Sequence, residues 1–215
     1  MKNSLNVTHL FVDVGDTLLE PIQYNARRGL LALKEHCLDA SRFDLETLLE
    51  RTRVLDLEIE TRAEESMLEY RQMDFQRLVF DADGVEFALS DQDREWVYWE
   101  AALAFQSEPN VAEALETLRD AGFRLGVISN TAGSSETIRR ELSRHGLLQF
   151  FELGVETSAD YGIRKPNSAL FQAILGKNGV TPESSAYIGN SYYHDVIGAG
   201  NTGMRVIWYN RRSHP

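Results

Sequence analysis

The stretch FVDVGDTLLE at residues 11–20 decides how the rest of the chain is interpreted. It overlaps THLFVDV at residues 8–14, whose β-branched and aromatic side chains predict a buried strand bounded by Gly15. Two carboxylates, Asp13 and Asp16, stand at the end of this strand. Ligands of α/β sheets bind beyond the carboxyl ends of the strands, so the spacing of these acids bears directly on function.

Strand and helix patterns alternate in the second half of the chain. Apolar spacing predicts helices over residues 111–121, 134–145 and 168–177. Strands are expected between and after them, at 123–130, 150–155, 185–188 and 204–209. This alternation predicts right-handed β-α-β units and an α/β fold with a doubly wound, Rossmann-like parallel sheet. The first strand must join that sheet, because a single strand is not stable alone.

The segment between the first strand and this half has a different pattern. From Pro21 to about Phe105, four stretches show helical spacing, and no convincing strand is expected. We therefore predict a core domain formed by residues 1–18 and 106–215. The intervening residues 19–105 are predicted to form an inserted, all-helical cap domain.

Composition limits the possible partners. The chain has 215 residues and a net charge of -11, from 22 basic and 33 acidic residues. Such a surface repels phosphate backbones and anionic lipids, so neither nucleic acid nor a membrane is an expected partner. The single cysteine, Cys37, excludes an intramolecular disulfide. No signal segment or membrane-spanning apolar run is recognised, so a cytoplasmic protein is expected, and its oligomeric state stays open.

Three later loops also carry polar residues beside predicted strands. The motif ISNT contains Ser129 and Asn130, RKP contains Lys165, and IGNSYYHDVIGAGNTGM contains Asn190 and Asp195. Each motif alone is better explained by turn formation, helix capping or a solvated side chain. Four such loops in sequence, each at a predicted strand end, indicate a shared site.

Together with DVGDT, this order resembles the haloacid dehalogenase-like hydrolase superfamily, with residues 19–105 in the place of a C1-type helical cap. The resemblance covers nearly the whole chain and implies an aspartyl-phosphate formed on Asp13, with Lys165 neutralising charge. It also implies a site that binds a small phosphorylated metabolite and Mg²⁺, and hydrolyses its phosphate ester. The implied phosphate-binding residues are Ser129, Asn130 and Thr17, and the implied metal ligands are Asp13, the carbonyl of Gly15, Asn190 and Asp195.

Two positions depart from the family pattern. Phosphatases of the family carry an aspartate two residues after the nucleophile, which serves as general acid and base, and here that residue is Gly15. Asp16, one residue later, is the candidate replacement, as is an unidentified cap residue. The metal-facing aspartate of the fourth loop is replaced by Asn190, whose uncharged amide oxygen should hold Mg²⁺ less tightly.

Two other functions stay open. Dehalogenases of the family also lack the second aspartate and need no metal, but they place tyrosines where this chain has Gly15 and Phe171. A catalytically weak member that binds a ligand or a protein is the third possibility. The cap aromatics, such as Trp96 and Trp99, do not reveal the substrate, because large aromatics on a helix are usually buried in a core.

A second acidic stretch, LVFDADGV at residues 78–85, has the two-residue spacing that the first one lacks. Asp81 and Asp83 nevertheless follow a helical pattern, and Val85 stands where the motif requires a threonine. We interpret residues 81–84 as a turn between two cap helices.

Overall fold

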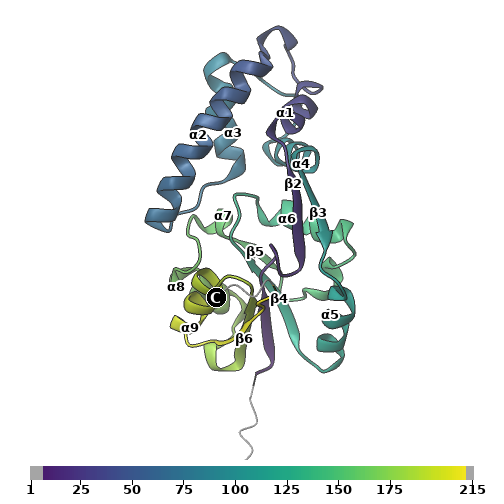
Figure 1. Ribbon diagram of the computed structural model, residues 1–215, viewed down its shortest axis with the longest axis vertical. Coiled ribbons are helices and arrows are strands. Elements are labelled where there is room, and N and C mark those ends of the chain that lie inside the picture. The colour runs from purple at the N-terminus through teal and green to yellow at the C-terminus, as the bar shows by residue number, and fades with distance from the viewer. Residues whose placement is uncertain (1–6, 212–215) are drawn as a thin grey trace, which may run out of the picture.

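A parallel sheet forms the base of the computed structural model, which describes residues 7–211 (Figure 1). Its five strands within this range have the order β5-β4-β1-β6-β7 and all pair in parallel. They are β1 (His9–Val12), β4 (Arg124–Ser129), β5 (Val155–Thr157), β6 (Ser185–Gly189) and β7 (Arg205–Trp208). The chain adds strands first on one side of β1 and then on the other. The carboxyl end of β1 therefore lies at the topological switch point, and the predicted fold class is confirmed.

Helices cover both faces of this sheet. They are α5 (Val111–Asp120), α6 (Ser135–Arg144), α7 (Ser158–Tyr161), α8 (Ser168–Asn178) and α9 (Gly198–Asn201), with the short 3-10 helices η3 (Leu148–Phe150) and η4 (Pro182–Ser184) and the π-helix η5 (Tyr192–Ile197). Successive side chains of a strand point to opposite faces. Leu10 and Val12 accordingly join a buried cluster with Leu142 of α6, whereas Phe11 joins another with Phe171 of α8.

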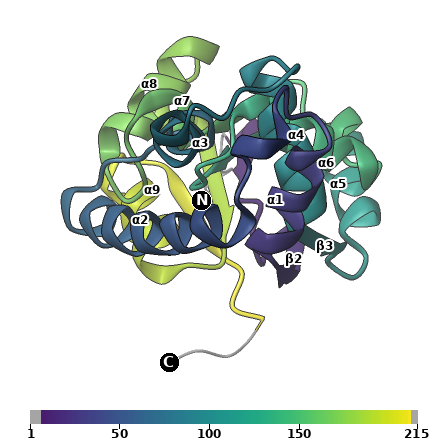
Figure 2. The same cartoon turned by 90° about the horizontal axis from the view of Figure 1, so that it is seen from above.

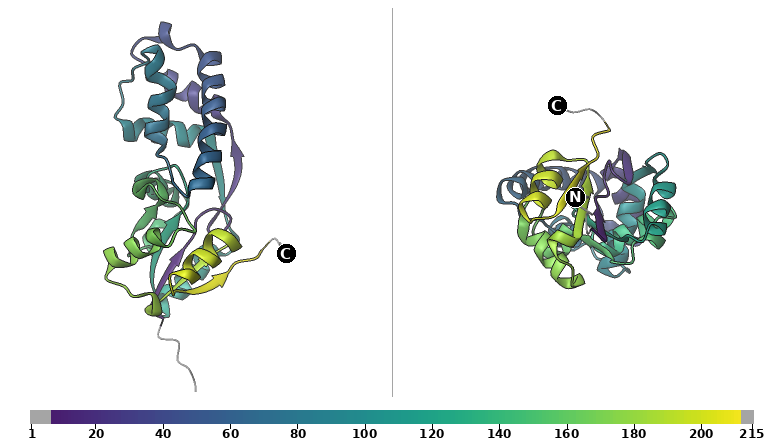
Figure 3. Two further views of the ribbon diagram at one scale, coloured as in Figure 1. Left: turned by 90° about the vertical axis from the view of Figure 1, so that its left-hand side faces the viewer. Right: turned by 90° about the horizontal axis from the view of Figure 1, so that it is seen from below.

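Four helices lie beyond the carboxyl edge of the sheet (Figures 1 and 3). They are α1 (Ala26–Lys34), α2 (Leu45–Ser66), α3 (Gln72–Phe80) and α4 (Asp91–Ala102), with short turns η1 (Ala40–Arg42) and η2 (Asp81–Asp83). Asn25, Asp44 and Ser90 cap three of them by accepting backbone N–H bonds. Viewed from above, α1 lies beside α4 (Figure 2). Their buried side chains form a third cluster drawn from residues 30–102. The four expected helices are thus confirmed, and the domain boundaries stay a prediction.

The expectation of no strand between Pro21 and Phe105 is wrong. β2 (Leu19–Tyr24) and β3 (Leu103–Ser107) pair as an antiparallel ribbon that joins the two layers (Figure 1). The sequence LEPIQY hides this strand because Pro21 interrupts it and most of its side chains are exposed. Its formation depends on a partner strand that lies about 80 residues away in the chain.

The short strand expected at 150–155 is also displaced. Residues 148–150 form the turn η3, and strand pairing begins at Val155. The apolar side chains that suggested a strand, Phe150 and Phe151, are buried in the core from this turn instead. Across residues 7–211, none of the helices has the length and apolar character needed to cross a bilayer.

Candidate active site

The loop after β1 turns sharply at the carboxyl edge of the sheet. The carbonyl of Val14 accepts hydrogen bonds from the amides of Thr17, Leu18 and Leu19. Asp13 is held one residue before this turn, because its amide donates to the carbonyl of Ile188 in β6 at 2.9 Å. Its side chain therefore stands where β1 and β6 end together.

The ammonium group of Lys165 lies at the centre of the site. It donates to Asp13 Oδ1 at 2.8 Å, to Asp195 Oδ1 at 2.7 Å and to the Tyr187 hydroxyl at 2.8 Å. A lysine has three N–H donors, so these partners use all of them. Lys165 is 2% exposed, and its charge is balanced by two carboxylates from separate loops.

The two carboxylates also set the protonation of the site. Burial raises the pKa of Asp13 to about 6; the positive charge of Lys165 opposes this shift, and the negative charge of Asp195 adds to it. Burial by itself would lower the pKa of Lys165, but Asp13 and Asp195 outweigh it and raise that pKa above its usual value. Lys165 therefore stays charged while Asp13 titrates.

Asp195 reaches Lys165 because residue 189 is a glycine. A Cβ atom at position 189 would lie 2.4 Å from the Asp195 carboxyl carbon, far closer than any allowed contact. The second carboxylate oxygen of Asp195 accepts a hydrogen bond from the Ser191 amide at 2.9 Å. Both oxygens are thus engaged by protein donors. The structure brings Asp195 into the site as predicted, and its contact there is a hydrogen bond from Lys165.

Asn130 has partners that its predicted phosphate-binding role did not anticipate. Its amide nitrogen donates to the carbonyl of Lys165 at 3.0 Å, and its amide oxygen accepts from the Lys165 amide at 2.7 Å. These two hydrogen bonds hold the backbone at Lys165 against the end of β4. The neighbouring Ser129 is buried in the same loop. A phosphate-binding role for Ser129 and Asn130 stays a prediction.

The space around Gly15, where the family has its second aspartate, is not filled by neighbouring side chains of residues 7–211. A Cβ atom at Gly15 would meet no other atom within 4 Å among the described residues. Asp16 is partly exposed and has a left-handed backbone with a φ of 53°. Thr17 donates a long hydrogen bond of 3.4 Å to the amide oxygen of Asn190, which brings the first and fourth loops together. The site therefore has room for a side chain at position 15 that this chain does not supply.

Comparisons with known proteins agree with this geometry. A family model described as haloacid dehalogenase-like hydrolase matches residues 61–209, well over half of the chain. The chain belongs to this family. The matched range contains the ISNT, RKP and IGNSYYHDVIGAGNTGM loops, whereas the loop with Asp13 lies before it.

Three relatives show how far the likeness extends. A glyceraldehyde 3-phosphate phosphatase of Methanothermobacter thermautotrophicus is 40% identical over 102 residues, 47% of this chain and 44% of the relative. A phosphoserine phosphatase of Thermus thermophilus is 35% identical over 107 residues, 50% of this chain and 42% of the relative. The chain thus spans less than half the length of these curated relatives. The 2-haloacid dehalogenase structure from Pseudomonas syringae pv. Tomato has a TM-score of 0.61, with 24% identity, 97% of this chain and 89% of that chain covered, which supports the fold.

The metal donors of this haloacid dehalogenase-like hydrolase are few. Within residues 7–211 no group of three or more histidine, cysteine, aspartate or glutamate side chains is arranged to hold a metal. The predicted ligands are the Asp13 carboxylate, the Gly15 carbonyl, the Asn190 amide oxygen and the Asp195 carboxylate, whose two oxygens already accept hydrogen bonds from Lys165 and Ser191. All are hard oxygens, and Mg²⁺ is often held by one or two carboxylates with water and substrate phosphate. These donors fit such a weakly held ion.

The second acidic stretch forms the predicted turn. Residues 81–83 are the short helix η2, and Gly84 ends it with a φ of 60°. Asp83 pairs with Arg51 at 2.6 Å, and Asp81 lies 3.7 Å from Arg77. Their partners are cap arginines, so the interpretation of this stretch as a turn is confirmed.

Several residues around the site were not anticipated from the sequence. Tyr187 is fully buried, and its hydroxyl donates to the Ile128 carbonyl at 2.6 Å while it accepts from Lys165. A tyrosine inside the otherwise apolar strand AYIG was the available signal. The cap aromatic Trp99 is a packing residue, because its ring is buried and its nitrogen donates to Glu141 of α6 at 3.0 Å.

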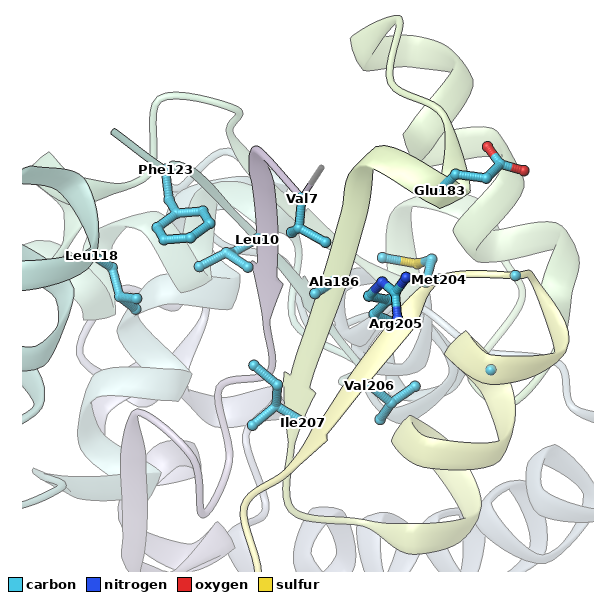
Figure 4. Close-up of a pocket in the computed structure, with 12 residues that line it drawn as sticks. Val7, Leu10, Leu118, Phe123, Glu183, Ala186, Met204, Arg205, Val206 and Ile207 are labelled. Carbon is cyan, nitrogen blue, oxygen red and sulfur yellow. The ribbon is translucent and has the colours of Figure 1, made fainter. Parts of the chain in front are cut away.

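A large groove lies at the opposite end of the sheet (Figure 4). Its volume is about 820 Å³, and its lining includes Val7, Leu10, Phe123 and Met204. These residues lie near the amino ends of their strands, away from the ends that carry Asp13 and Lys165. The lining is mainly apolar and includes none of the predicted site residues.

Proposed function

We propose that this protein hydrolyses the phosphate ester of a small metabolite through an aspartyl-phosphate on Asp13. The observation that carries the proposal is the placement of Lys165 between Asp13 and Asp195, at the switch point of the sheet. A buried, permanently charged lysine beside a carboxylate is suited to an anionic ligand, because it neutralises both the nucleophile and the transferred group. The two phosphatase relatives support the same reaction class.

The reaction proceeds in two displacements. The second carboxylate oxygen of Asp13, Oδ2, attacks phosphorus, and the bond between phosphorus and the ester oxygen breaks. The bonding electrons leave with the alcohol oxygen, which takes up a proton. A water oxygen then attacks the phosphorus of the aspartyl-phosphate and loses a proton, and the bond between phosphorus and Asp13 Oδ2 breaks, which releases inorganic phosphate and regenerates the Asp13 carboxylate.

Several groups would assist these steps. Lys165 donates a hydrogen bond to Asp13 Oδ1 at 2.8 Å, and we therefore assign the attack on phosphorus to the other carboxylate oxygen. Ser129 would donate to phosphoryl oxygens from the end of β4. Mg²⁺, held by Asp13, the Gly15 carbonyl and Asn190, would supply charge neutralisation at the phosphoryl group when bound.

The proton for the leaving alcohol is the step at which this chain differs from its family. Gly15 cannot supply it, and we propose Asp16, the nearest carboxylate in the same loop, as the general acid. Because the backbone of Asp16 is left-handed, its side chain leaves the loop in a different direction from that of an aspartate at position 15. We therefore expect turnover slower than a site with the usual pair of aspartates would give.

Dehalogenation is the weaker candidate. The position where family dehalogenases have a second tyrosine is Phe171, which is fully buried and packs edge-on against Tyr187 with ring centroids 5.3 Å apart. This side chain is part of the core below the site and has no hydroxyl to offer. Gly15 likewise has no side chain to take the place of the first tyrosine.

The test is phosphate release by the purified protein with Mg²⁺, on p-nitrophenyl phosphate and a broad panel of phosphorylated metabolites. We expect turnover that Asp13→Asn removes and that EDTA reduces. The absence of phosphate release from every compound would refute the proposal. In that case, halide release from 2-haloacids in EDTA would indicate a dehalogenase, and its absence as well would indicate a binding protein.

A further inference from the structure

A short segment of the cap is bonded directly to the loops that carry the site. This junction segment, residues 67–72, connects α2 to α3 above α7 (Figure 1). Its backbone forms a small antiparallel ladder with residues 162–164: the Arg164 amide donates to the Met67 carbonyl at 3.0 Å, and the Glu69 amide donates to the Gly162 carbonyl at 3.1 Å. The Gln72 amide also donates to the Ala132 carbonyl at 2.8 Å. The cap is thus attached to the core at a place separate from the β2-β3 ribbon.

Glu69 is the side chain at the centre of this attachment. Its side chain is 1% exposed, and its carboxylate accepts a hydrogen bond from the Ser158 hydroxyl at 2.8 Å. The same hydroxyl accepts from the Thr131 amide at 2.9 Å. Ser158 therefore connects a cap carboxylate to the backbone of the loop that contains Ser129.

The same carboxylate also reaches the lysine loop. It lies 3.4 Å from Nε of Arg164, the residue directly before Lys165. Arg164 is about nine-tenths buried, and Glu60 and Glu64 of α2 lie 3.1 and 3.5 Å from its Nη1. Those two acids are about half exposed, so Glu69 is the buried member of the three.

Burying a carboxylate is unfavourable unless it is paired with a positive charge and hydrogen-bonded. Burial raises the pKa of Glu69, and Arg164 and the Ser158 hydroxyl oppose that shift. The two groups that Glu69 contacts belong to two different loops, and Asn130 then joins these loops to each other through the Lys165 backbone. A displacement of Glu69 would be transmitted to both.

We propose that Glu69 is a cap-borne positioning residue, which aligns the Ser129–Thr131 loop and the Lys165 loop through Ser158 and Arg164. The two core loops then adopt the geometry needed for catalysis only while the junction segment keeps its contacts with them. The effect expected on kcat rests on the proposed phosphatase function. The alignment of the two loops rests on the contacts alone.

The kinetic test compares Glu69→Ala with Glu69→Gln, because the glutamine amide oxygen can still accept the Ser158 hydrogen bond. Small displacements of catalytic groups cost up to about 100-fold in rate. We expect Glu69→Ala to lower kcat about 10- to 100-fold with a smaller change in KM, and Glu69→Gln to restore most of it. Glu60→Gln, which removes one exposed contact of the same arginine, should stay within about twofold of the unsubstituted protein.

Amide hydrogen exchange without substrate is the structural test. Ser158→Ala should speed exchange at the Thr131 amide and leave the Arg164 amide unchanged, whereas Glu69→Ala should speed both. The Val127 amide, which donates to Gly154 at 3.0 Å within the sheet, is the reference that should not change and shows that each variant is folded.

Two results would overturn the inference: unchanged exchange at Thr131 in Glu69→Ala, or a kcat for that variant equal to that of the unsubstituted protein. If the unsubstituted protein itself releases no phosphate, the proposed function fails. The exchange measurements then decide alone whether Glu69 aligns the loops.

Discussion

Two loops of this protein carry closely spaced aspartates. Comparing them distinguishes the effect of the spacing of the aspartates in sequence from the effect of their location in the fold. The cap turn at residues 81–83 has the two-residue spacing usual for a catalytic pair, whereas the loop after β1 has Asp13 followed by Gly15. Asp13 is 8% exposed and bonded to Lys165. Asp83 is about one-third exposed and pairs with Arg51 of the same layer of helices.

The difference shows what makes a carboxylate suitable for catalysis. Parallel strands end at the same edge, so residues far apart in sequence meet there, and Asp13, Lys165 and Asp195 come from three such loops. The cap turn has no converging strands, and its acids pair with neighbouring arginines on exposed helices. The position in the sheet therefore outweighs an imperfect spacing.

The largest effect should come from removing the carboxylate at position 13. Asp13→Asn eliminates the proposed nucleophile, and loss of a catalytic nucleophile costs on the order of 10⁴- to 10⁶-fold in kcat. We expect phosphate release to fall to background in an assay of the purified variant. Asp81→Asn and Asp83→Asn are the matched controls and should stay within about twofold. A comparable loss in either control would reverse the assignment of the two loops.

The next largest effect should come from supplying the missing carboxylate. Gly15→Asp places a side chain where no described atom lies within 4 Å, so the fold should tolerate it. General acid–base groups contribute about 10² to 10⁴-fold, and kcat should rise toward that range. Gly15→Asn has the same shape without an ionisable carboxyl group and should give no increase. Equal rates for Gly15→Asp and the unsubstituted protein would show that another residue already provides the proton.

These comparisons also show which parts of the fold local sequence specifies. The inward residues of α8, such as Leu170 and Ile174, are buried as their spacing predicts, because helix periodicity depends on neighbours in sequence. The strands β1, β4, β6 and β7 were recognisable from local composition, whereas β5 was expected too early in the chain. The β2-β3 ribbon was not recognisable, since β2 is interrupted by Pro21 and mostly exposed, and its partner strand lies about 80 positions further along the chain.

The site shows the same division. The sequence predicted that Asp13, Lys165 and Asp195 would meet, because each follows a recognisable motif near a strand end. It did not predict the contact of Glu69 with Ser158, which lies 89 residues further along the chain and belongs to no motif. The clamp formed by Asn130 was hidden for another reason: an amide in a motif loop can bind either ligand or backbone.

The pH dependence of stability should have opposite signs in the two loops. Burial raises the pKa of Asp13 from 3.8 to about 6, so its stabilising contribution is fully present below pH 3.8 and is lost as pH rises through about 6. Asp13→Asn should thus gain stability relative to the unsubstituted protein between pH 4 and pH 7, by on the order of 2–3 kcal/mol. Unfolding by denaturant in EDTA measures this difference, and a constant difference across that interval would contradict the shift.

Asp83 provides the contrast for that measurement. Its hydrogen bond with Arg51 lowers its pKa below 3.8, so its contribution is present above pH 3.8 and is lost as pH falls through the folded-state pKa. Asp83→Asn should therefore lose stability relative to the unsubstituted protein at neutral pH, and this loss should shrink as pH falls below 3.8 and disappear below the folded-state pKa. Parallel curves for the two variants would show that both aspartates sit in the same kind of environment.

The smallest effect concerns the glycines of the two loops. Gly84 has a φ of 60°, and an alanine there adopts a left-handed conformation that costs about 1 kcal/mol. An alanine at Gly15 meets no such penalty, because its φ lies outside that region and its surroundings are open, so the free energy of unfolding should change by less than about 0.5 kcal/mol. Denaturant unfolding of Gly84→Ala and Gly15→Ala measures both. A larger loss for Gly15→Ala would mean that the empty position in the catalytic loop is required by the backbone, and Gly15→Asp would then fail for structural reasons.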